Sequence, residues 1–598
     1  MNFAAIIHEP KSSFSYAYST DKLHIRIKTA KNDVDNIELL AVDPFNWIPR
    51  NDGSGVYDFD IDSVYKIKMV KEQITRDHDC WFAEISDIKW KRIKYCFIIE
   101  NKNEKYILGS HYRLPYTKDK SKLYDLFNYF NYPYINAEDL YIAPDWVSNT
   151  IWYQIFPKSF YGGNNSTEGN LLGIIEKLDY IKEAGFNGIY LNPIFESPSQ
   201  HKYDTTDYFK VDKELGDNEI FGKLVKEAHK RGIKVMLDAV FNHCGFFHPY
   251  WQDVVIKGEK SKYYDCFYIL DPDKPIVNGN LKNGVPQEVE REDLNYYTFA
   301  YTQSMPKWNT SNPIAREYLL NVACYWVEKY DIDGWRLDVS NEVSHDFWRE
   351  LRKRLKSIKP DVYILGENWD NSYPWLKGDQ FDAVMNYEFS IPIWSYFRLN
   401  NTAKIKYSSN DFKFELSKLL VGYPKHLTKN LFNLLDSHDT ERFFSIVNEK
   451  VEVAKLAYLL LFTYPGSPCI YYGSEVGMSG GEHKNRQPMI WDEAKQNKEL
   501  FLFIKKLIQL RKTYESFRIE NFQWMNIEEG NNIIMYKKEC EKEVLYVVLN
   551  NDSISKKIAF PEEIKGLKVK ECIEEKDILI DKEIELLPYN YKVYLQNK

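Results

Sequence analysis

The chain has 598 residues, of which 44% are hydrophobic, and a formal net charge of −8. This length provides for about four domains with sizeable cores, and so small a charge gives no indication of binding to nucleic acid or to an anionic membrane. The eight cysteines are scattered without a CxxC pair or a zinc-like spacing, which predicts reduced thiols in a cytoplasmic protein. The first residues lack the basic start and long apolar segment of a signal peptide. The longest apolar run, 457–472, contains prolines, so no membrane span is expected.

Residues 1–125 consist of short runs in which apolar and polar residues alternate, separated by turn residues. The clearest of these runs are 23–30, 36–42, 80–85 and 91–99. Alternation with a period of two predicts strands, and several short strands of this kind predict an N-terminal β-sandwich. Trp47 and Trp81 could stack on a sugar, but the hydrophobic core is the more common place for a tryptophan in such strands.

From residue 151 the pattern changes to strands that alternate with amphipathic helices, which is typical of a parallel α/β sheet. Eight strands are expected, at 151–157, 186–193, 234–243, 333–340, 361–368, 382–387, 430–439 and 467–475. Eight such units predict an α/β fold of the (β/α)8 TIM-barrel type over residues 126–515. Asn312 and Pro313 form a good helix start for the helix expected at 313–329.

Two segments do not follow the strand–helix pattern of the barrel. A long irregular stretch, 244–309, follows the third strand and is expected to form a small inserted domain. Beyond a helix at 498–513, short alternating runs return. These runs predict a C-terminal antiparallel β domain over residues 516–598.

Charged side chains stand at the ends of several of the expected barrel strands. Arg336 and Asp338 are two residues apart, so they share one face of a strand. Such a pair is costly to bury unless it forms an ion pair or takes part in chemistry, and a structural ion pair is the simpler alternative. Polar residues also end three other strands: Asp238, Asn242, His243, Glu367 and Asp439. Polar groups at the ends of successive parallel strands are the pattern of a barrel active site.

Four sequence blocks carry a resemblance to a known family. They are DAVFNH (238–243), GWRLDVSNEV (334–343), LGENW (365–369) and LLDSHD (434–439). In order and spacing they resemble the signature of the α-amylase family, glycoside hydrolase family 13. The block MPKWN (305–309) and the N-terminal AIIHEP resemble the neopullulanase, cyclomaltodextrinase and maltogenic amylase branch of that family. The resemblance covers nearly the whole chain and implies that the N-terminal domain is similar to a starch-binding module.

The resemblance also implies roles for three carboxylates. Glycosidic cleavage needs one carboxylate that traps an oxocarbenium-like carbon and one carboxylic acid that protonates the leaving oxygen. Asp338 resembles the family's nucleophile, Glu367 its acid/base, and Asp439 the residue that holds sugar hydroxyls and favours the distorted ring. Arg336 is expected to keep Asp338 ionised, and the surrounding carboxylates are expected to keep Glu367 protonated.

Further residues resemble the family's substrate-binding groups. Tyr203, His243 and His438 resemble the residues that hold the sugar at the point of cleavage. Trp369, Trp308, Asn341 and Glu342 resemble acceptor-side residues, although a core position is the main alternative for Trp308. Arg486 resembles a donor-side clamp, or it is a surface arginine. The complete expected binding set is Tyr203, Asp238, Asn242, His243, Arg336, Glu342, Trp369, His438 and Arg486.

Two features depart from the family pattern. The loop in YQIFPKSFYGGNNSTEGNL is short and has Asn170 where an aspartate is usual. A calcium ion prefers six or more oxygen ligands with several carboxylates, whereas this loop offers Glu168 and amides, so neither calcium nor any other cofactor is expected. The acid's block has Asn368 and Asp370 where an apolar residue and a histidine are more usual, which concerns the acceptor side and not the chemistry.

Taken together, the residues and the resemblance predict an intracellular retaining α-glucan hydrolase. Its expected substrates are cyclodextrins, maltodextrins and pullulan, with cleavage of α-1,4 and potentially α-1,6 bonds. One alternative is a transglycosylase of the same family, and another is a non-catalytic glucan-binding protein on an amylase fold. The resemblance further implies a homodimer in which the N-terminal domain of one subunit covers the barrel mouth of the other. No nucleic-acid or membrane partner is expected.

Overall fold

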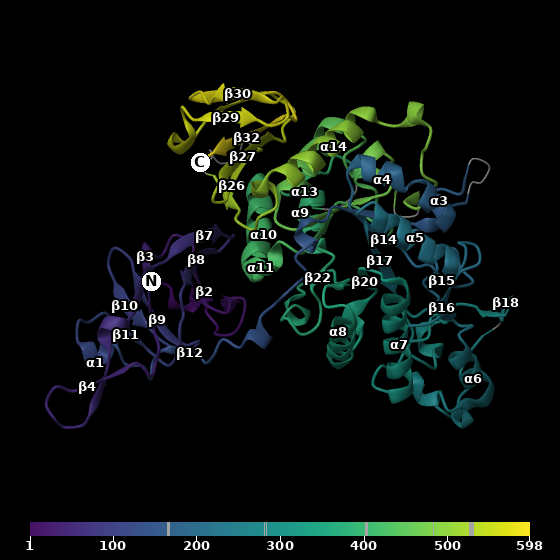
Figure 1. The fold of residues 1–598 in the computed structure, drawn as a ribbon, viewed down its shortest axis with the longest axis horizontal. Helices are drawn as coiled ribbons and strands as arrows, with labels where there is room; N and C mark the ends of the chain where they lie inside the picture. The colour runs from purple at the N-terminus through teal and green to yellow at the C-terminus, as the bar shows by residue number, and fades with distance from the viewer. Residues whose placement is uncertain (164–167, 280, 283, 401–404, 482–483, 526–531) are drawn as a thin grey trace. The chain divides into compact units, whose positions relative to one another are not determined.

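The structure is a computed structural model that describes residues 1–163, 168–279, 281–282, 284–400, 405–481, 484–525 and 532–598. The chain divides into two compact units (Figure 1). The first comprises Met1–Ile142, Tyr407–Thr428 and Glu520–Lys537, and the second comprises Ala143–Lys406, Lys429–Ile519 and Lys538–Lys598. Each unit is described by itself below.

The first unit contains the expected β-sandwich of two antiparallel sheets. One sheet has the order β1-β2-β8-β7, formed by Ser15–Ser19, Lys22–Ala30, His78–Ile85 and Val70–Ile74. The other has the order β11-β10-β9-β3-β6, formed by Arg113–Pro115, Lys105–Leu108, Ile93–Glu100, Asn36–Val42 and Tyr65–Lys68. Alternate residues of these strands, such as Leu23, Ile25 and Ile27, fill a shared core, as a strand period of two requires. The sandwich prediction is confirmed.

The two tryptophans of the N-terminal domain differ in burial, and the sandwich extends beyond the predicted limit. Trp81 is a core residue, whereas Trp47 lies on the hairpin of β4 (Trp47–Pro49) and β5 (Tyr57–Phe59) and is 49% exposed. Strand β12 (Phe130–Tyr132) pairs with β9, although it lies beyond residue 125. The domain limits drawn from the sequence stay a prediction.

Helices α10 (Ser409–Gly422) and α11 (Lys425–Thr428) also belong to the first unit. A buried ion network joins their segment to the sandwich strands. The Arg26 Nε atom donates to Glu72 Oε2 at 2.9 Å, and its Nη1 atom donates to the Tyr423 carbonyl oxygen at 2.6 Å. Lys425 Nζ lies 3.1 Å from Glu72 Oε1. The segment 407–428, which lies between two barrel strands in sequence, is therefore bound to the sandwich by both charge and backbone contacts.

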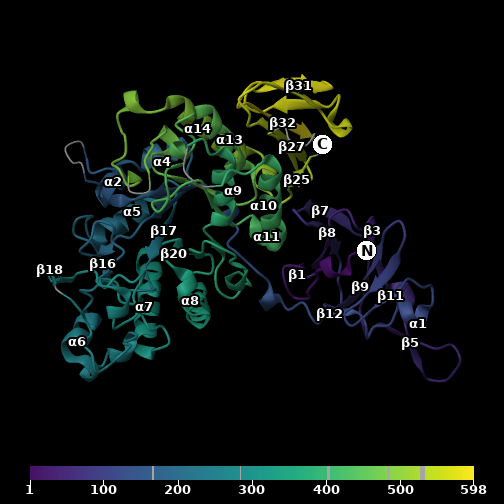
Figure 2. The same ribbon diagram turned by 180° about the vertical axis from the view of Figure 1, so that it is seen from behind.

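The second unit contains the predicted barrel (Figures 1 and 2). Its eight-stranded sheet has the order β22-β21-β20-β17-β14-β13-β24-β23. In chain order the strands are β13 (Trp152–Ile155), β14 (Gly188–Leu191), β17 (Lys234–Ala239), β20 (Gly334–Leu337), β21 (Tyr363–Gly366), β22 (Ala383–Val384), β23 (Phe432–Leu434) and β24 (Ser467–Tyr471). A parallel bridge between Met385 and Phe432 joins the two outermost strands and closes the sheet. All eight strands lie within the predicted ranges, so the barrel prediction is confirmed.

Helices cover the outer face of the closed sheet, as Figures 1 and 2 show. They include α3 (Leu171–Glu176), α4 (Leu178–Ala184), α5 (Asn218–Lys230), α7 (Pro313–Tyr330), α8 (His345–Ile358), α9 (Tyr387–Phe397), α13 (Val451–Thr463) and α14 (Lys498–Thr513). Helix α7 begins as predicted, because Asn312 Oδ1 accepts a hydrogen bond from the Ile314 amide at 2.9 Å and Pro313 occupies the first turn. Apolar side chains such as Trp152, Tyr190 and Tyr363 fill the barrel interior below the polar end.

The segment between β17 and α7 contains α6 (Pro249–Lys257) and the short pair β18 (Leu281–Lys282) and β19 (Val285–Pro286). Trp308 is only 2% exposed there and stacks on Phe267 with 4.7 Å between ring centroids. The expectation that Trp308 forms an acceptor-side wall is wrong, because its ring is part of the core of this segment.

The C-terminal part of the second unit is an antiparallel sheet in which β27 (Glu543–Asn550), β32 (Tyr591–Asn597), β29 (Lys568–Glu571) and β30 (Lys576–Leu579) are neighbours. Strands β28 (Lys556–Ala559) and β31 (Glu583–Leu586) form a separate pair. This agrees with the predicted C-terminal β fold. In the part of the chain that the structure describes, no helix has the length and apolar character needed to cross a membrane.

Candidate active site

A cavity of about 460 Å³ lies at the carboxyl ends of the barrel strands. Eight of the residues singled out in the sequence line it: Tyr203, His243, Asp338, Asn341, Glu367, Trp369, Asp439 and Arg486. They come from different loops, each placed by the end of a barrel strand. The closed parallel sheet therefore gathers residues that lie more than 280 positions apart in the sequence.

The strand register places Asp338 and Glu367 next to each other. Leu337 of β20 pairs with Gly366 of β21, and each carboxylate is the following residue. The Glu367 amide donates to the Leu337 carbonyl oxygen at 2.9 Å, so the parallel ladder continues to the point where both side chains enter the cavity. The Asp338 amide likewise donates to the Ala239 carbonyl oxygen at 3.0 Å. These two bonds hold both carboxylates at one level of the barrel.

One buried guanidinium holds the carboxylates of this level together. Arg336 is fully buried, and its Nη1 atom lies 2.7 Å from Asp338 Oδ1 and 2.9 Å from Asp238 Oδ1. Its Nη2 atom lies 2.8 Å from Glu367 Oε2. Arg336 therefore contacts Asp338, as expected, but the same cation also serves two further carboxylates.

The charge balance of this cluster affects the pKa of Asp338. Burial, followed by the negative charges of Glu367 and Asp238, raises the pKa of Asp338 well above its usual range, against the opposing effect of Arg336. One guanidinium is shared among three carboxylates, so Arg336 offsets only part of this rise, against the expectation that it keeps Asp338 ionised. Two carboxylates of the cluster, Asp338 and Glu367, lie side by side in the cavity. The arrangement can thus supply both a proton donor and a carboxylate nucleophile.

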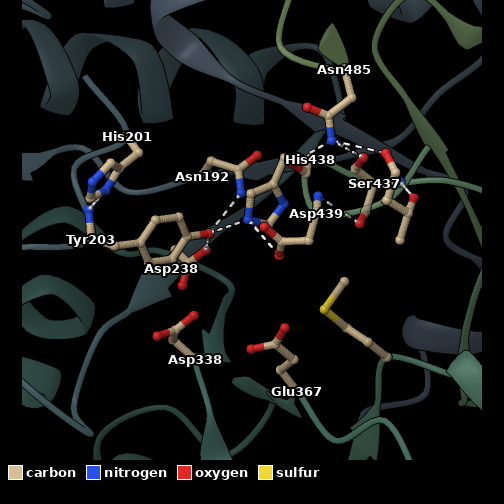
Figure 3. A network of polar contacts seen from close by, with 12 residues as sticks. Asn192, His201, Tyr203, Asp238, Asp338, Glu367, Ser437, His438, Asp439 and Asn485 are labelled. Carbon is tan, nitrogen blue, oxygen red and sulfur yellow. Dashed lines mark hydrogen bonds and ion pairs between the residues drawn. The ribbon is translucent and has the colours of Figure 1, made fainter. Parts of the chain in front are cut away.

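Asp439 enters the cavity from the loop after β23 and stays ionised. Figure 3 shows its carboxyl group pointing into the same region as those of Asp338 and Glu367. Burial would raise the pKa of Asp439, but His438, at 2.9 Å, and the guanidinium groups of Arg336 and Arg486 lower it below its usual range. The Arg486 Nη2 atom lies 3.1 Å from Asp439 Oδ1, so Arg486 is a cavity residue and not a free surface arginine.

His243 and Tyr203 present polar atoms and ring faces to the cavity. His243 is 1% exposed, and burial, with the positive charge of Lys307, lowers its pKa to about 3, so the imidazole is neutral. Its Nε2 atom has no hydrogen-bond partner among the described residues. The Tyr203 hydroxyl lies 2.5 Å from His438 Nε2 and donates to Asp238 Oδ2 at 3.1 Å, as seen in Figure 3. A neutral imidazole with an unused nitrogen can bind a sugar hydroxyl.

Five residues of the expected binding set are not among those that line the cavity: Asp238, Asn242, Arg336 and His438, which are buried, and Glu342, which is exposed. Their contacts orient the residues that form the wall. Asp238 accepts a hydrogen bond from the Tyr190 hydroxyl at 2.6 Å, and Asn242 accepts one from Lys307. Glu342 lies 3.2 Å from Lys307 Nζ. The four buried groups therefore have a supporting position in the free protein.

Four residues that line the cavity escaped the sequence reasoning: His201, Phe299, Met305 and Val339. Phe299 stacks on His243 with ring centroids 4.9 Å apart. Phe299 and Met305 come from the inserted segment, whose strands and helices the sequence pattern did not define. Met305 could have been identified from its place in the MPKWN block, and Val339 from its place beside the proposed nucleophile.

The described carboxylates and amide of the loop after Pro157 already have partners within the chain. Lys158 Nζ lies 2.8 Å from Glu168 Oε2 and 3.0 Å from Glu214 Oε2, so an ammonium group already neutralises the carboxylates of this region. Asn170 Oδ1 accepts a hydrogen bond from the Gly173 amide at 2.9 Å and caps α3. Residues 164–167 of the predicted loop lie outside the described residues. Among the residues that are described, no group of three or more His, Cys, Asp or Glu side chains is placed to hold a metal.

Known protein families and individual proteins are similar to this chain over most of its length. The alpha amylase catalytic domain matches residues 154–520, and the alpha amylase N-terminal ig-like domain matches residues 1–136. The chain is 41% identical over 589 residues to a cyclomaltodextrinase of Geobacillus thermopakistaniensis, covering 95% of this chain and 94% of the relative. It is 39% identical over 583 residues to an intracellular maltogenic amylase of Bacillus subtilis, covering 94% and 93% of the two chains. A solved structure of a cyclomaltodextrinase, 36% identical, superposes with a TM-score of 0.88 and full coverage of both chains. The chain therefore belongs to the α-amylase family of glycoside hydrolases.

Proposed function

We propose that the protein is a retaining α-glucan hydrolase in which Asp338 is the nucleophile and Glu367 the acid/base. The observation that carries this proposal is the binding of both carboxylates to the single Arg336 guanidinium, at 2.7 and 2.8 Å. Carboxylates held on the two outer nitrogens of one guanidinium fit the short separation, about 5–5.5 Å, that retaining glycosidases use. Both groups also line the cavity.

The proposed reaction proceeds in two displacements. The Asp338 carboxylate attacks the anomeric carbon while Glu367 gives its proton to the leaving glycosidic oxygen, so the C–O bond breaks as the glycosyl-enzyme ester forms. Glu367, now ionised, removes a proton from water, and the resulting hydroxide displaces Asp338. Arg336 stabilises the carboxylate that forms at each step, that of Glu367 in the first and that of Asp338 in the second. The product keeps its original anomeric configuration.

The cavity wall supplies binding groups on both sides of the scissile bond. Asp439 offers an ionised acceptor for sugar hydroxyls, and His243 offers its unused Nε2 atom. The Tyr203 ring suits the apolar C–H face of a pyranose. Trp369 is 39% exposed and stacks in parallel on Tyr387 with 3.7 Å between ring centroids. It provides a rigid surface for the acceptor-side sugar.

The substrates that we propose are cyclodextrins, short maltodextrins and pullulan. The names of the relatives, cyclomaltodextrinase and intracellular maltogenic amylase, support both this choice and a cytoplasmic location. The test is incubation with β-cyclodextrin, pullulan and soluble starch in parallel, with chromatography of the products and NMR of the newly formed anomer. We expect maltose-sized products with the α configuration. Products longer than the substrate would identify a transglycosylase, and an absence of cleavage would identify a non-catalytic glucan-binding protein.

We also propose that the protein assembles as a homodimer through its N-terminal domain. The hairpin of β4 and β5 carries several exposed apolar side chains, among them Trp47 at 49% and Tyr57 at 59%, and Phe45 just before it is 66% exposed. A patch of this kind on a protein surface commonly marks an interface with another protein. A second copy that covers the barrel mouth would exclude bulky starch while admitting rings and short chains.

Calcium independence is the remaining part of the proposed function. The Lys158 ammonium group supplies the positive charge that a calcium ion would bring to Glu168 and Glu214. None of the steps proposed above uses a metal or another cofactor, because the proton transfers and the nucleophilic attack are all assigned to side chains of the chain itself.

A further inference from the structure

The residue after the proposed nucleophile has an unusual backbone conformation. Val339 has φ 44° and ψ 43°, in the left-handed region. A β-branched residue rarely adopts this conformation, because its side chain crowds the backbone. Such strain persists only where surrounding contacts enforce it, and it is frequent at functional sites.

The strained conformation directs a backbone donor at the proposed acid. The Val339 amide donates a hydrogen bond to Glu367 Oε2 at 2.9 Å. The other carboxylate oxygen, Oε1, lies 3.4 Å from the Trp369 indole nitrogen. The turn after Asp338 therefore has a direct influence on the orientation of the Glu367 carboxyl group.

A buried pair of side chains holds this turn against the strand of the acid. The Ser340 hydroxyl donates to the Asn368 carboxamide oxygen at 2.8 Å and lies 3.1 Å from the Glu367 carbonyl oxygen. Ser340 is fully buried and Asn368 is 4% exposed. The two residues follow Val339 and Glu367 in the chain, so their hydrogen bond joins the two loops directly behind the carboxylates.

We propose that Ser340 and Asn368 act as a positioning pair that keeps the Val339 amide on the acid and so fixes its proton toward the leaving oxygen. Neither side chain lines the cavity, so the pair acts through Glu367 and not on the sugar, in contrast to the expectation that Asn368 concerns only the acceptor side. The proposal rests on the proposed role of Glu367 as the acid/base.

The contacts of Asn368 favour a functional role over a purely structural one. Its Nδ2 atom is buried and has no hydrogen-bond partner among the described residues. Burial of an amide nitrogen without an acceptor is unfavourable for folding, so stability alone does not favour an asparagine here. An apolar residue of similar size, as in Asn368→Leu, should therefore fold at least as stably while losing the bond to Ser340.

The test compares two substrates that differ in their need for an acid. Maltotriose has a poor leaving group that must be protonated, whereas fluoride leaves from α-maltosyl fluoride with little help. The variants are Ser340→Ala and Asn368→Leu, and Glu367→Gln serves as the reference for loss of the acid. Ser390→Ala is the matched control, because the Ser390 hydroxyl is equally buried but donates to the Leu434 carbonyl oxygen at 2.7 Å.

We expect Ser340→Ala and Asn368→Leu each to lower kcat/KM on maltotriose about tenfold, a fraction of the 10²–10⁴-fold that a general acid contributes. On α-maltosyl fluoride kcat/KM, which reports only the first displacement, should change less than about threefold, because that substrate needs little protonation. Thermal unfolding should show that Asn368→Leu is no less stable than the parent. The Ser390→Ala control should keep the ratio of the two rates unchanged.

Different results would refute the positioning role of Ser340 and Asn368 and the acid role of Glu367. If Glu367→Gln discriminates between the substrates but Ser340→Ala and Asn368→Leu do not, the positioning role is refuted and the function stands. If Glu367→Gln lowers kcat/KM, which reports the first displacement alone, equally on both substrates, the assignment of the acid itself is wrong.

Discussion

Asp338 and Glu367 are each one residue beyond the register pair Leu337–Gly366, so the two carboxylates leave adjacent strands at the same level. The two carboxylates are close because β20 and β21 are neighbouring strands, and Arg336 contacts both of them. Because this geometry is set by the backbone ladder, substitution of either side chain should alter the chemistry and leave the barrel intact.

The first prediction concerns these two carboxylates. Asp338→Asn and Glu367→Gln should each lower kcat on maltotriose by several orders of magnitude, because they remove the nucleophile and the proton donor. The circular dichroism spectrum should be unchanged. Retention of a tenth of the parental activity by either variant would contradict the assigned roles.

The fold and the three carboxylates could be predicted from the sequence because both depend on local patterns. Strands alternating with helices define a barrel, and a polar residue directly after an apolar strand is placed at the barrel mouth whatever the details of packing. Asp338 and Glu367 directly follow β20 and β21, Asp439 lies in the loop after β23, and all three line the cavity.

Contacts between distant, irregular segments could not be predicted in this way. Phe299 reaches the cavity from the inserted segment, where no periodicity fixes the direction of a side chain. The burial of Trp308 depends on its stacking with Phe267, and the attachment of 407–428 to the sandwich depends on the buried side chain of Arg26. Each of these requires the tertiary structure, because the partners lie far apart or in loops.

The second prediction concerns an ion network at the amino-terminal end of the barrel. Asp333 is 1% exposed and lies 2.6 Å from His229, 2.9 Å from Lys234 and 3.1 Å from Lys359. Burial would raise the pKa of Asp333, but the hydrogen bond from His229 and the charges of Lys359 and Lys234 lower it below 3.8. Asp333→Asn should cost about 3 kcal/mol at pH 7, near the lower end for a broken buried pair because the partners are partly exposed.

The sign of the pH dependence follows from that lowered pKa. The stabilising contribution of Asp333 is present above the ordinary pKa of 3.8 and is lost as the pH falls through the lower pKa of the folded state. The difference in unfolding free energy between the parent and Asp333→Asn should thus be constant from neutral pH to about pH 5 and shrink below about pH 4. Urea titrations at several pH values measure it. A difference that grew with acidity would contradict the argument, and kcat should be unaffected because the network lies at the end of the barrel opposite the cavity.

The third prediction concerns calcium. EDTA should leave the melting temperature unchanged, because Lys158 already neutralises Glu168 and Glu214. Lys158→Met should lower the unfolding free energy by about 1 kcal/mol, a small amount because both carboxylates are substantially exposed. Lys210→Met is the control, since Lys210 is itself exposed and pairs with Asp207 at the surface. A fall of many degrees in EDTA that calcium reverses would show that the parent protein binds the ion.

The last prediction concerns the hairpin of β4 and β5 in assembly. If a second copy covers this hairpin, light scattering at micromolar concentration should find a dimer, and the protein should prefer β-cyclodextrin to soluble starch. The double substitution Trp47→Ser with Tyr57→Ser removes two large apolar side chains that are 49% and 59% exposed, so it should weaken a dimer without disturbing the sandwich core. Point substitutions are preferable to deletion of residues 1–125, because deletion would also remove Arg26 and Glu72, which bind the segment 407–428.

Trp90→Ser is the matched control, since Trp90 is 65% exposed but lies outside the hairpin. The double variant should become monomeric and lose part of its preference for the ring, whereas Trp90→Ser should change neither property. A parent protein that is monomeric and still prefers cyclodextrin would show that the preference arises within a single chain.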